Sequence, residues 1–422
     1  MPRTFLFLIF WAIYWAALRP VSAERLSPLS SAPDWQDLGV FQQTITHDEF
    51  TQLLAGVYAP NVDLAPWFEI EPTQVRIAKG NGDWFTLKFS GSSDVQVAPR
   101  YWRIADRLPA DLEHPLSGFK IALDPGHLGG AWAKMEERWF QIDDSKPVTE
   151  GDLTLRVAQL IAPRLAGLGA QVLWVRSHPG PVTTRSPETL RSLAFLTLVA
   201  RGMHPISQNY TDPFDPWREH SIQWEAEKLF YRVAEIHDRA LAVNTVLRPD
   251  LTLCLHFNAE PWGNPTSPTL VDANHLHFIV NGGYSAAELA YDDVRYAMLI
   301  KLLNRSFTEE KEIAESLAAH MAPVTWLPPF HYQTNNAVSI GKTGYVWARN
   351  LLANRLYQCP VAYIECYVMN SHEFFNRFQA GEYEGVRSFN GVMRKNIYEE
   401  YADGVVEGIE AYFKRQKVKR TP

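Results

Sequence analysis

The chain has 422 residues, of which 46% are hydrophobic and 21% are charged. This length can bury a large core, and this composition excludes an intrinsically disordered protein. The 40 Lys and Arg residues against 47 Asp and Glu residues give a net charge of -7. That balance argues against nucleic acid as a partner, because phosphate binding needs a basic surface. The three cysteines are too few for a disulfide scaffold.

Residues 1–23 have the pattern of a secretory signal peptide. Arg3 supplies the positive start, residues 4–18 an apolar core, and Val21-Ser-Ala23 a small-residue cleavage site. The apolar core is shorter than the about 20 residues that span a bilayer. We therefore expect an exported protein, periplasmic or extracellular, with no stable membrane insertion after cleavage. An uncleaved membrane anchor is the alternative.

Residues 24–115 contain no catalytic motif and predict a small, strand-rich accessory α+β domain. Residues 27–37 are rich in serine and proline, which is typical of a linker. Residues 47–57 predict a short helix. Two apolar runs, 75–78 and 84–89, flank a Gly-Asn-Gly turn and predict a hairpin. The expected role of this domain is packing against the rest of the chain.

Residues 116–422 begin with a buried strand at 119–123 that ends in Asp124-Pro-Gly126. Proline fixes φ and glycine permits positive φ, so His127 is expected on a tight turn at the carboxyl end of the strand. A helix with one apolar face begins at Glu150, although Pro163 should kink it. The next strand, 170–176, then implies a parallel pair with a right-handed crossover.

Residues 177–231 predict a long insertion that is partly helical near 190–200. Long loops in compact domains are usually functional, so we expect this insertion to restrict access to the site. Further helices are predicted at 229–247, 312–321 and 398–412. Further strands are predicted at 251–255, 275–280 and 360–365.

Four ionisable residues share one edge of the predicted sheet. His127, His256 and Glu365 end strands, and Glu150 begins a helix. Buried charged groups are unfavourable unless something pairs them, and one divalent metal would pair all four. Two imidazoles and a carboxylate with an open fourth position are typical of catalytic zinc, and a further carboxylate supplies a general base. The alternative is four separate, solvated surface residues.

The sequence resembles the zinc-dependent N-acetylmuramoyl-L-alanine amidases. Asp124-Pro-Gly-His-Leu-Gly129 matches the family motif Asp-Pro-Gly-His-Gly-Gly, and Glu150 matches its helix-opening glutamate. Cys254-Leu-His-Phe-Asn-Ala259 matches Ser-Ile-His-Ala-Asn-Ala. Ile364-Glu-Cys-Tyr-Val-Met-Asn370 matches the motif of the catalytic glutamate. The resemblance covers residues 118–414 with long gaps and none of the first domain.

The resemblance implies a three-layer α/β/α fold with a mainly parallel central sheet. It also implies Zn2+ held by His127, Glu150 and His256, with metal-bound water as the nucleophile and Glu365 as the catalytic base. The substrate would be peptidoglycan, cut at the amide between N-acetylmuramic acid and L-alanine. Whether the protein has a protein activator is left open. The alternatives are a zinc peptidase or amidase acting on another cell-envelope amide, and a non-catalytic envelope-binding protein of the same fold.

The sequence departs from the family pattern in several places. Leu128 interrupts the double glycine after His127. The segment before Glu150 is long, and its acidic residues are alternative ligands, although the rigid helix start favours Glu150; they are Glu136, Glu137, Asp143 and Asp144. Cys366 and Tyr367 replace small neighbours of the base, which bears on substrate preference.

Overall fold

The computed structural model describes residues 25–91, 96–105, 111–262 and 269–418. The predicted signal peptide, residues 1–23, lies outside the described residues. No helix within the described ranges is long and apolar enough to cross a membrane.

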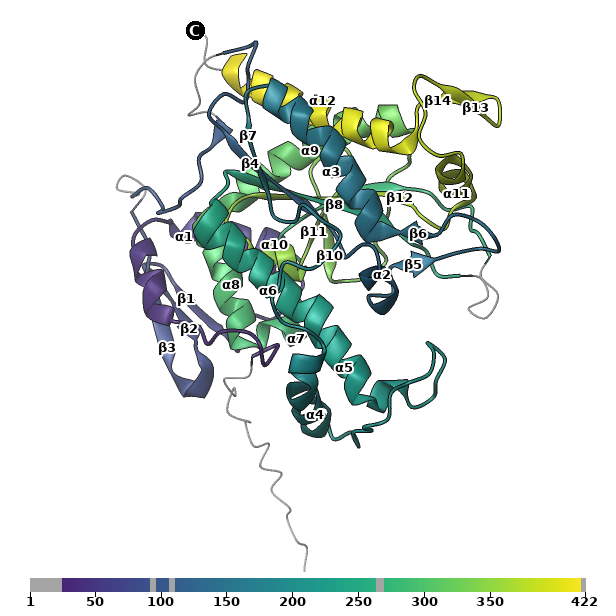
Figure 1. Ribbon diagram of the computed structural model, residues 1–422. Helices are drawn as coiled ribbons and strands as arrows, with labels where there is room; N and C mark the ends of the chain where they lie inside the picture. The colour runs from purple at the N-terminus through teal and green to yellow at the C-terminus, as the bar shows by residue number, and fades with distance from the viewer. Residues whose placement is uncertain (1–24, 92–95, 106–110, 263–268, 419–422) are drawn as a thin grey trace, which may run out of the picture.

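A seven-stranded sheet forms the centre of the molecule (Figure 1). Its strands are β4 (Lys120–Pro125), β7 (Gln171–Trp174), β8 (Leu251–Asn258), β9 (Leu276–Val280), β10 (Ala337–Ile340), β11 (Val346–Arg349) and β12 (Val361–Val368). Their order is β10-β11-β9-β12-β8-β4-β7. β12, β8, β4 and β7 are parallel, whereas β9 runs antiparallel to β12 and β11 runs parallel to β9. The carboxyl ends of β4, β8 and β12 therefore meet at one edge.

Helices cover both faces of this sheet, which confirms the expected three-layer α/β/α fold. One face packs against α3 (Glu150–Gly167), α9 (Ser306–Thr325) and α12 (Ile397–Val418). The other face packs against α6 (Glu235–Leu241) and α10 (Leu352–Leu356). Alternation along β8 explains the layers, because Leu253 and Leu255 join the first core and Cys254 joins the second.

The helix predicted at 229–247 begins earlier and belongs to a longer unit. It comprises α5 (Ile222–Lys228), η7 (Leu229–Ala234), α6 and η8 (Ala242–Leu247) in direct succession. The Ser221 hydroxyl caps its start by accepting from Trp224 N. In α3 the helix starts at Glu150 as predicted and continues through Pro163.

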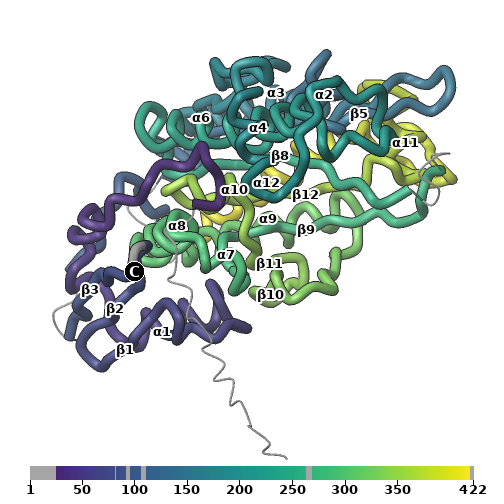
Figure 2. Tube along the Cα trace, turned by 90° about the horizontal axis from the view of Figure 1, so that it is seen from below, coloured from purple at the N-terminus to yellow at the C-terminus, as the bar shows by residue number. Residues whose placement is uncertain are grey.

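The N-terminal part has helical turns and a small antiparallel sheet. It contains η1 (Trp35–Phe41), α1 (His47–Leu53), η2 (Leu54–Tyr58), β1 (Phe68–Glu71), β2 (Gln74–Ala78), η3 (Gly80–Gly82) and β3 (Trp84–Lys88). The predicted hairpin is present as β2 and β3, and β1 extends it. This part lies beside α8 (Asp292–Leu303) (Figure 2). Trp35 Nε1 donates to Asp292 Oδ2 at 3.2 Å, and the Arg295 guanidinium donates to the Ala78 carbonyl.

The N-terminal part shares its core with the rest of the molecule. One cluster of buried hydrophobic residues runs from Trp35 through the sheet to Phe413. The boundary predicted at residue 115 stays a prediction. The remaining elements are α2 (Trp132–Met135), β5 (Trp139–Phe140), β6 (Val148–Thr149), η5 (Glu188–Leu190), α4 (Arg191–Ala200), η6 (Arg218–His220), α7 (Ala286–Leu289), α11 (His372–Gln379), β13 (Arg387–Phe389) and β14 (Val392–Arg394).

The predicted insertion, residues 177–231, contains α4 and α5, which project from the body in Figure 1. Its hydrophobic core includes Leu198 and Phe230, and Leu128 joins that core with 1% of its surface exposed. The residue that interrupts the double glycine therefore packs against the insertion. This contact gives a physical reason for Leu128, because a glycine there would leave the insertion core unfilled.

Candidate metal centre

His127 lies on a strained turn directly after β4. Its φ is +58°, a left-handed conformation that is uncommon for a residue with a side chain. The expectation of a positive φ at Gly126 is wrong, because His127 has the positive φ instead. Gly126 is required for a different reason. A Cβ atom at this position would lie 2.1 Å from His256 Cε1, so glycine lets the backbone approach the second histidine.

Two buried arginines hold the backbone of this turn. Arg176 Nε donates to the Pro125 carbonyl at 3.1 Å, and its Nη2 reaches the Gly126 carbonyl at 3.3 Å. Arg239 Nη1 also donates to the Pro125 carbonyl, at 3.0 Å, and to Asp124 Oδ1 at 2.8 Å. Both guanidinium groups are buried. The carbonyl oxygens at the end of β4 thus have fixed partners, which stabilises a turn that would otherwise relax.

The structure brings His127, Glu150 and His256 together. One ligand atom from each lies within 4.8 Å of the other two. His127 Nε2 is 3.4 Å from Glu150 Oε2, and His256 Nδ1 is 3.3 Å from Glu150 Oε1. The two imidazole rings are nearly perpendicular, with centroids 5.0 Å apart. His127 follows the end of β4, Glu150 begins α3, and His256 lies near the end of β8. All three residues are therefore on or beside rigid elements.

The carboxylate of Glu150 is held in its ionised form. Burial raises its pKa, but His127, His256 and Arg138 outweigh burial and lower the pKa to about 2. Glu150 Oε1 also accepts from the Phe257 backbone N–H at 3.1 Å. A buried carboxylate between two imidazoles is a suitable ligand for a divalent cation, because ligands must bind deprotonated.

The three residues fit zinc by number, type and spacing. Structural and catalytic zinc sites use histidine nitrogen and carboxylate oxygen at about 2.0–2.2 Å, which separates tetrahedral ligand atoms by roughly 3.4 Å. Both pairs involving Glu150 lie at that separation. The chemistry and geometry of the donors therefore favour a divalent metal of this kind.

Glu136 orients His127 from behind. Its Oε1 lies 2.6 Å from His127 Nδ1, and its Oε2 accepts from the Leu128 backbone N–H at 2.6 Å. Burial raises the pKa of Glu136, but His127 and the Leu128 N–H lower it overall. A carboxylate on the second nitrogen fixes which imidazole nitrogen faces the metal. The sequence predicts Glu136 only as an alternative ligand and gives no sign of this contact with His127.

The other alternative ligands lie elsewhere. Glu137 pairs with Arg218 of the insertion. Asp143 and Asp144 are exposed on the loop between β5 and β6. None of these three carboxylates belongs to the His127, Glu150 and His256 group. Of the acidic residues considered, Glu150 at the helix start is the one that lies in a group with both histidines, and its role as a ligand stays a prediction.

Glu365 lies on the strand next to His256. In the parallel pair of β12 and β8, Glu365 is the register partner of His256. Burial is the main reason that its pKa is raised, and the negative charge of Glu150 adds to it, bringing the pKa to about 8. A divalent cation beside Glu150 would oppose this shift. Glu365 thus lies beside the group of His127, Glu150 and His256 without belonging to it.

Arg138 adds a positive charge at the same place. Its Nε lies 3.4 Å from Glu150 Oε2 and 3.3 Å from His127 Nε2. Its side chain is 41% exposed, which leaves room for movement toward solvent. Its backbone carbonyl accepts from the Glu150 N–H at 3.1 Å. The backbone of Arg138 thus supports the start of α3, while its side chain competes with any cation for Glu150.

A cavity of about 200 Å³ opens onto His127, Arg138 and His256. His127, His256 and Tyr363 line it on the sheet side, and the Tyr363 ring stacks on His256 at 4.3 Å. Arg232, next to the insertion, contributes to the opposite wall. A larger cavity of about 510 Å³ lies on the other side of α6, against residues 29–37, and contains none of the three ligands. The smaller cavity is the one relevant to chemistry.

The fold and the site define an α/β protein with a candidate divalent-metal centre at the carboxyl edge of its sheet. No protein-family model matches the chain, and no curated protein matches it in sequence. The chain is similar to the solved structure of N-acetylmuramyl-L-alanine amidase Ami1 from Mycobacterium smegmatis, with 16% identity and a TM-score of 0.36. That match covers 71% of this chain and 98% of the other.

Two further solved structures are similar to the chain. One is an N-acetylmuramoyl-L-alanine amidase from Clostridium difficile 630, with 14% identity, a TM-score of 0.35, and 73% and 100% of the two chains covered. The other is the CwlD amidase from Clostridioides difficile in complex with the GerS lipoprotein. It has 11% identity, a TM-score of 0.37, and 70% and 98% of the two chains covered.

Proposed function

We propose that this protein hydrolyses the amide bond between N-acetylmuramic acid and L-alanine in peptidoglycan. The proposal depends chiefly on the convergence of ligand atoms from His127, Glu150 and His256 within 4.8 Å, beside Glu365 on the adjacent strand. The motifs around these residues resemble those of the zinc-dependent amidases, and this resemblance indicates the substrate. Peptidoglycan is thus the expected partner.

The metal site would be formed by His127, Glu150 and His256. Zn2+ bound by them would bring the pKa of a water molecule to about 7 and polarise the carbonyl of the scissile amide. Glu136 holds the imidazole of His127 in one orientation. Tyr363 stacks on His256 and restricts the rotation of that ring.

Glu365 carries the proton in the proposed reaction. Its carboxylate accepts a proton from the attacking water, whose oxygen forms the new bond to the carbonyl carbon. The same carboxyl group then gives the proton to the leaving nitrogen as the C–N bond breaks. The products are a carboxyl group on the lactyl ether and the free amino group of L-alanine.

The direct test is digestion of purified peptidoglycan with the purified protein, followed by mass analysis of the released fragments. The proposal expects intact stem peptides with a free L-alanine amino group. Fragments cut within the stem peptide would instead indicate a peptidase on another envelope amide. Absence of any cleavage by metal-loaded protein would favour an envelope-binding protein of the same fold.

We also propose that the protein is exported and that residues 1–23 are removed. The charge of Arg3, the short apolar core and the Val21-Ser-Ala23 site support this. N-terminal sequencing of protein from native envelope fractions should give a mature chain that starts near Glu24. A membrane-bound form that keeps Met1 would contradict the prediction.

A further inference from the structure

Arg349 has no acidic partner among the described residues. Arg349 ends β11, and its Nη1 donates to Tyr332 Oη at 3.2 Å. Its guanidinium carbon lies 5.0 Å from the centroid of the Tyr332 ring. In the described part of the chain, no carboxylate oxygen pairs with this guanidinium within 4.0 Å. The charge of Arg349 is therefore held by an aromatic side chain and not by a counter-ion.

The neighbours of Arg349 do not neutralise it. Tyr332 Oη lies 2.9 Å from His277 Nε2, which links the three side chains in a row. Only 2% of His277 is exposed, and burial, followed by the charges of His275 and Arg349, lowers its pKa to about 3. Burial also raises the pKa of Tyr332. Both partners are therefore uncharged at neutral pH.

This row of side chains adjoins the proposed base. In the antiparallel pair of β9 and β12, His277 is the register partner of Glu365. Directly opposed residues of such a pair point to the same face, with Cβ atoms about 4.5–5.5 Å apart. Arg349 is thus linked to the strand that carries Glu365 through Tyr332 and His277.

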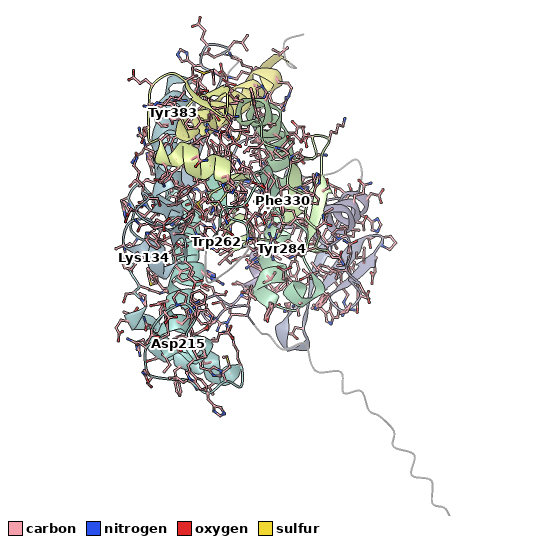
Figure 3. All side chains as sticks on the ribbon, turned by 90° about the vertical axis from the view of Figure 1, so that its right-hand side faces the viewer. Lys134, Asp215, Trp262, Tyr284, Phe330 and Tyr383 are labelled. Carbon is pink, nitrogen blue, oxygen red and sulfur yellow. The ribbon has the colours of Figure 1, made fainter. Side chains whose placement is uncertain are left out.

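The ring that contacts the guanidinium belongs to a group of aromatic side chains. The rings of Tyr332 and Trp347 lie 5.3 Å apart, and those of Phe330 and Tyr332 lie 4.8 Å apart. Trp347 Nε1 donates to the Phe330 carbonyl at 3.0 Å, which fixes the loop against β11. Figure 3 places Phe330 across Trp262 from Lys134, which belongs to the segment carrying Glu136.

This environment selects the chemistry of a ligand. A partly buried charge without a partner is unfavourable, and a bound anion would remove that penalty. The planar guanidinium matches a carboxylate with two parallel hydrogen bonds, and surrounding rings exclude competing water. Neutral His277 and Tyr332 add no repulsion to an anion. A carboxylate is the chemical class that fits.

We propose that Arg349, positioned by Tyr332, binds a carboxylate in the peptide part of the substrate, next to the scissile amide. This inference rests on the proposed function. It names Arg349 as a specificity-determining residue on the side of Glu365 away from His256. Substrates with a free carboxylate near the cleaved bond are then preferred over their amides.

The test compares two substrates that differ only in charge. N-acetylmuramoyl-L-alanyl-D-glutamate carries free carboxylates, and its diamide carries none. The wild-type protein should favour the diacid in kcat/KM by about 10- to 100-fold, since a charged hydrogen-bonded pair is replaced by a neutral one. Arg349→Gln should lose this preference by slowing the diacid while leaving the diamide nearly unchanged. Arg349→Lys should keep part of the preference, because it keeps the charge but loses the fork.

The matched control is Arg387→Gln. Arg387 is exposed on β13, and its guanidinium carbon lies 4.3 Å from the centroid of the Tyr383 ring, far from Phe330 in Figure 3. This variant should keep the wild-type preference. Equal rates of the wild-type protein on both substrates would overturn the inference. Equal losses on both substrates in Arg349→Gln would also overturn it, because Arg349 would then act only through Glu365 or the fold.

A binding measurement separates this inference from the proposed hydrolysis. Calorimetry compares L-alanyl-D-glutamate, the released peptide, with its diamide on the wild-type protein and on Arg349→Gln. If neither muramoyl substrate is cleaved, the proposed hydrolysis fails. A carboxylate preference that Arg349→Gln removes would then still support the subsite. Equal binding of the dipeptide and its diamide would overturn the subsite as well.

Discussion

The two sides of the candidate site differ in how their charges are compensated. On the metal side, formed by His127, Glu150 and His256, each polar group has partners within hydrogen-bond or ion-pair distance. On the base side, formed by Glu365, His277, Tyr332 and Arg349, Arg349 has no acidic partner among the described residues, and burial shifts the pKa values of Glu365 and His277.

This difference has a physical meaning. The metal side is arranged before any ligand arrives, because Glu136 and two buried arginines fix the turn that carries His127. The base side has unfavourable electrostatics that a substrate and a metal would relieve. A catalytic site is expected to combine preformed metal ligands with ionisable groups whose charges are not fully compensated. In a purely structural metal site, the protein would fill every coordination position of the metal.

Of the substitutions at Glu136, His277 and Arg138, the one that removes the support behind His127 should have the largest effect. Glu136→Ala should weaken metal affinity by about 10- to 100-fold, because the second hydrogen bond of a ligating histidine contributes this much. Glu137→Ala is the matched control and should bind metal normally, since Glu137 pairs with Arg218 instead. Chelator competition measures both. Equal affinities for the two variants would show that His127 needs no support.

On the base side, the lowered pKa of His277 should make the free energy of unfolding depend on pH. The pKa of His277 is lowered from 6.5 to about 3 in the fold, so between these values the unfolded chain binds more protons. Stability therefore falls as the pH drops below about 6.5. Between pH 6.5 and 5 this one group should contribute a loss of roughly 1.5 kcal/mol. In His277→Gln, the free energy of unfolding, measured with urea at pH 6.5 and pH 5, should fall by roughly 1.5 kcal/mol less than in the wild type. Parallel pH profiles for variant and wild type would contradict the low pKa.

The smallest effect is expected from Arg138, which crosses between the two sides. Its guanidinium lies 3.4 Å from Glu150 Oε2 and would repel a cation bound there. Because the side chain is 41% exposed, water screens much of this repulsion. Arg138→Ala should therefore tighten metal affinity by only about 3- to 5-fold. Arg138→Lys keeps the charge and should stay near the wild type. Weaker metal binding in Arg138→Ala would mean that Arg138 supports the ligands.

Much of the metal side could be predicted from the sequence. Short apolar runs that end in His127 and His256, and a helix that begins at Glu150, place these residues at one edge of a parallel sheet. The spacing of apolar residues identifies such strands and helices, because the residues on the buried face must be apolar. The role of Glu136 could not be predicted, because four acidic residues in one loop look alike until the chain is folded.

The base side was less accessible to prediction. The run that forms β9 was recognised as a strand, but an apolar run carries no information on direction, so its antiparallel pairing with β12 was not foreseen. β11, which carries Arg349, was not predicted. The contact between Arg349 and Tyr332 joins residues on separate segments. Such a contact depends on strand order, which local patterns do not contain.

The measurement that tests the central claim most directly is the metal content of two variants, Glu150→Ala and Glu365→Ala, beside their amide-bond turnover. The assignment predicts that Glu150→Ala loses its metal, because two remaining protein ligands bind zinc poorly. Glu365→Ala should keep the metal and the fold, while its turnover falls by about 10²- to 10⁴-fold. Metal lost from Glu365→Ala but retained in Glu150→Ala would exchange the two roles and contradict the account.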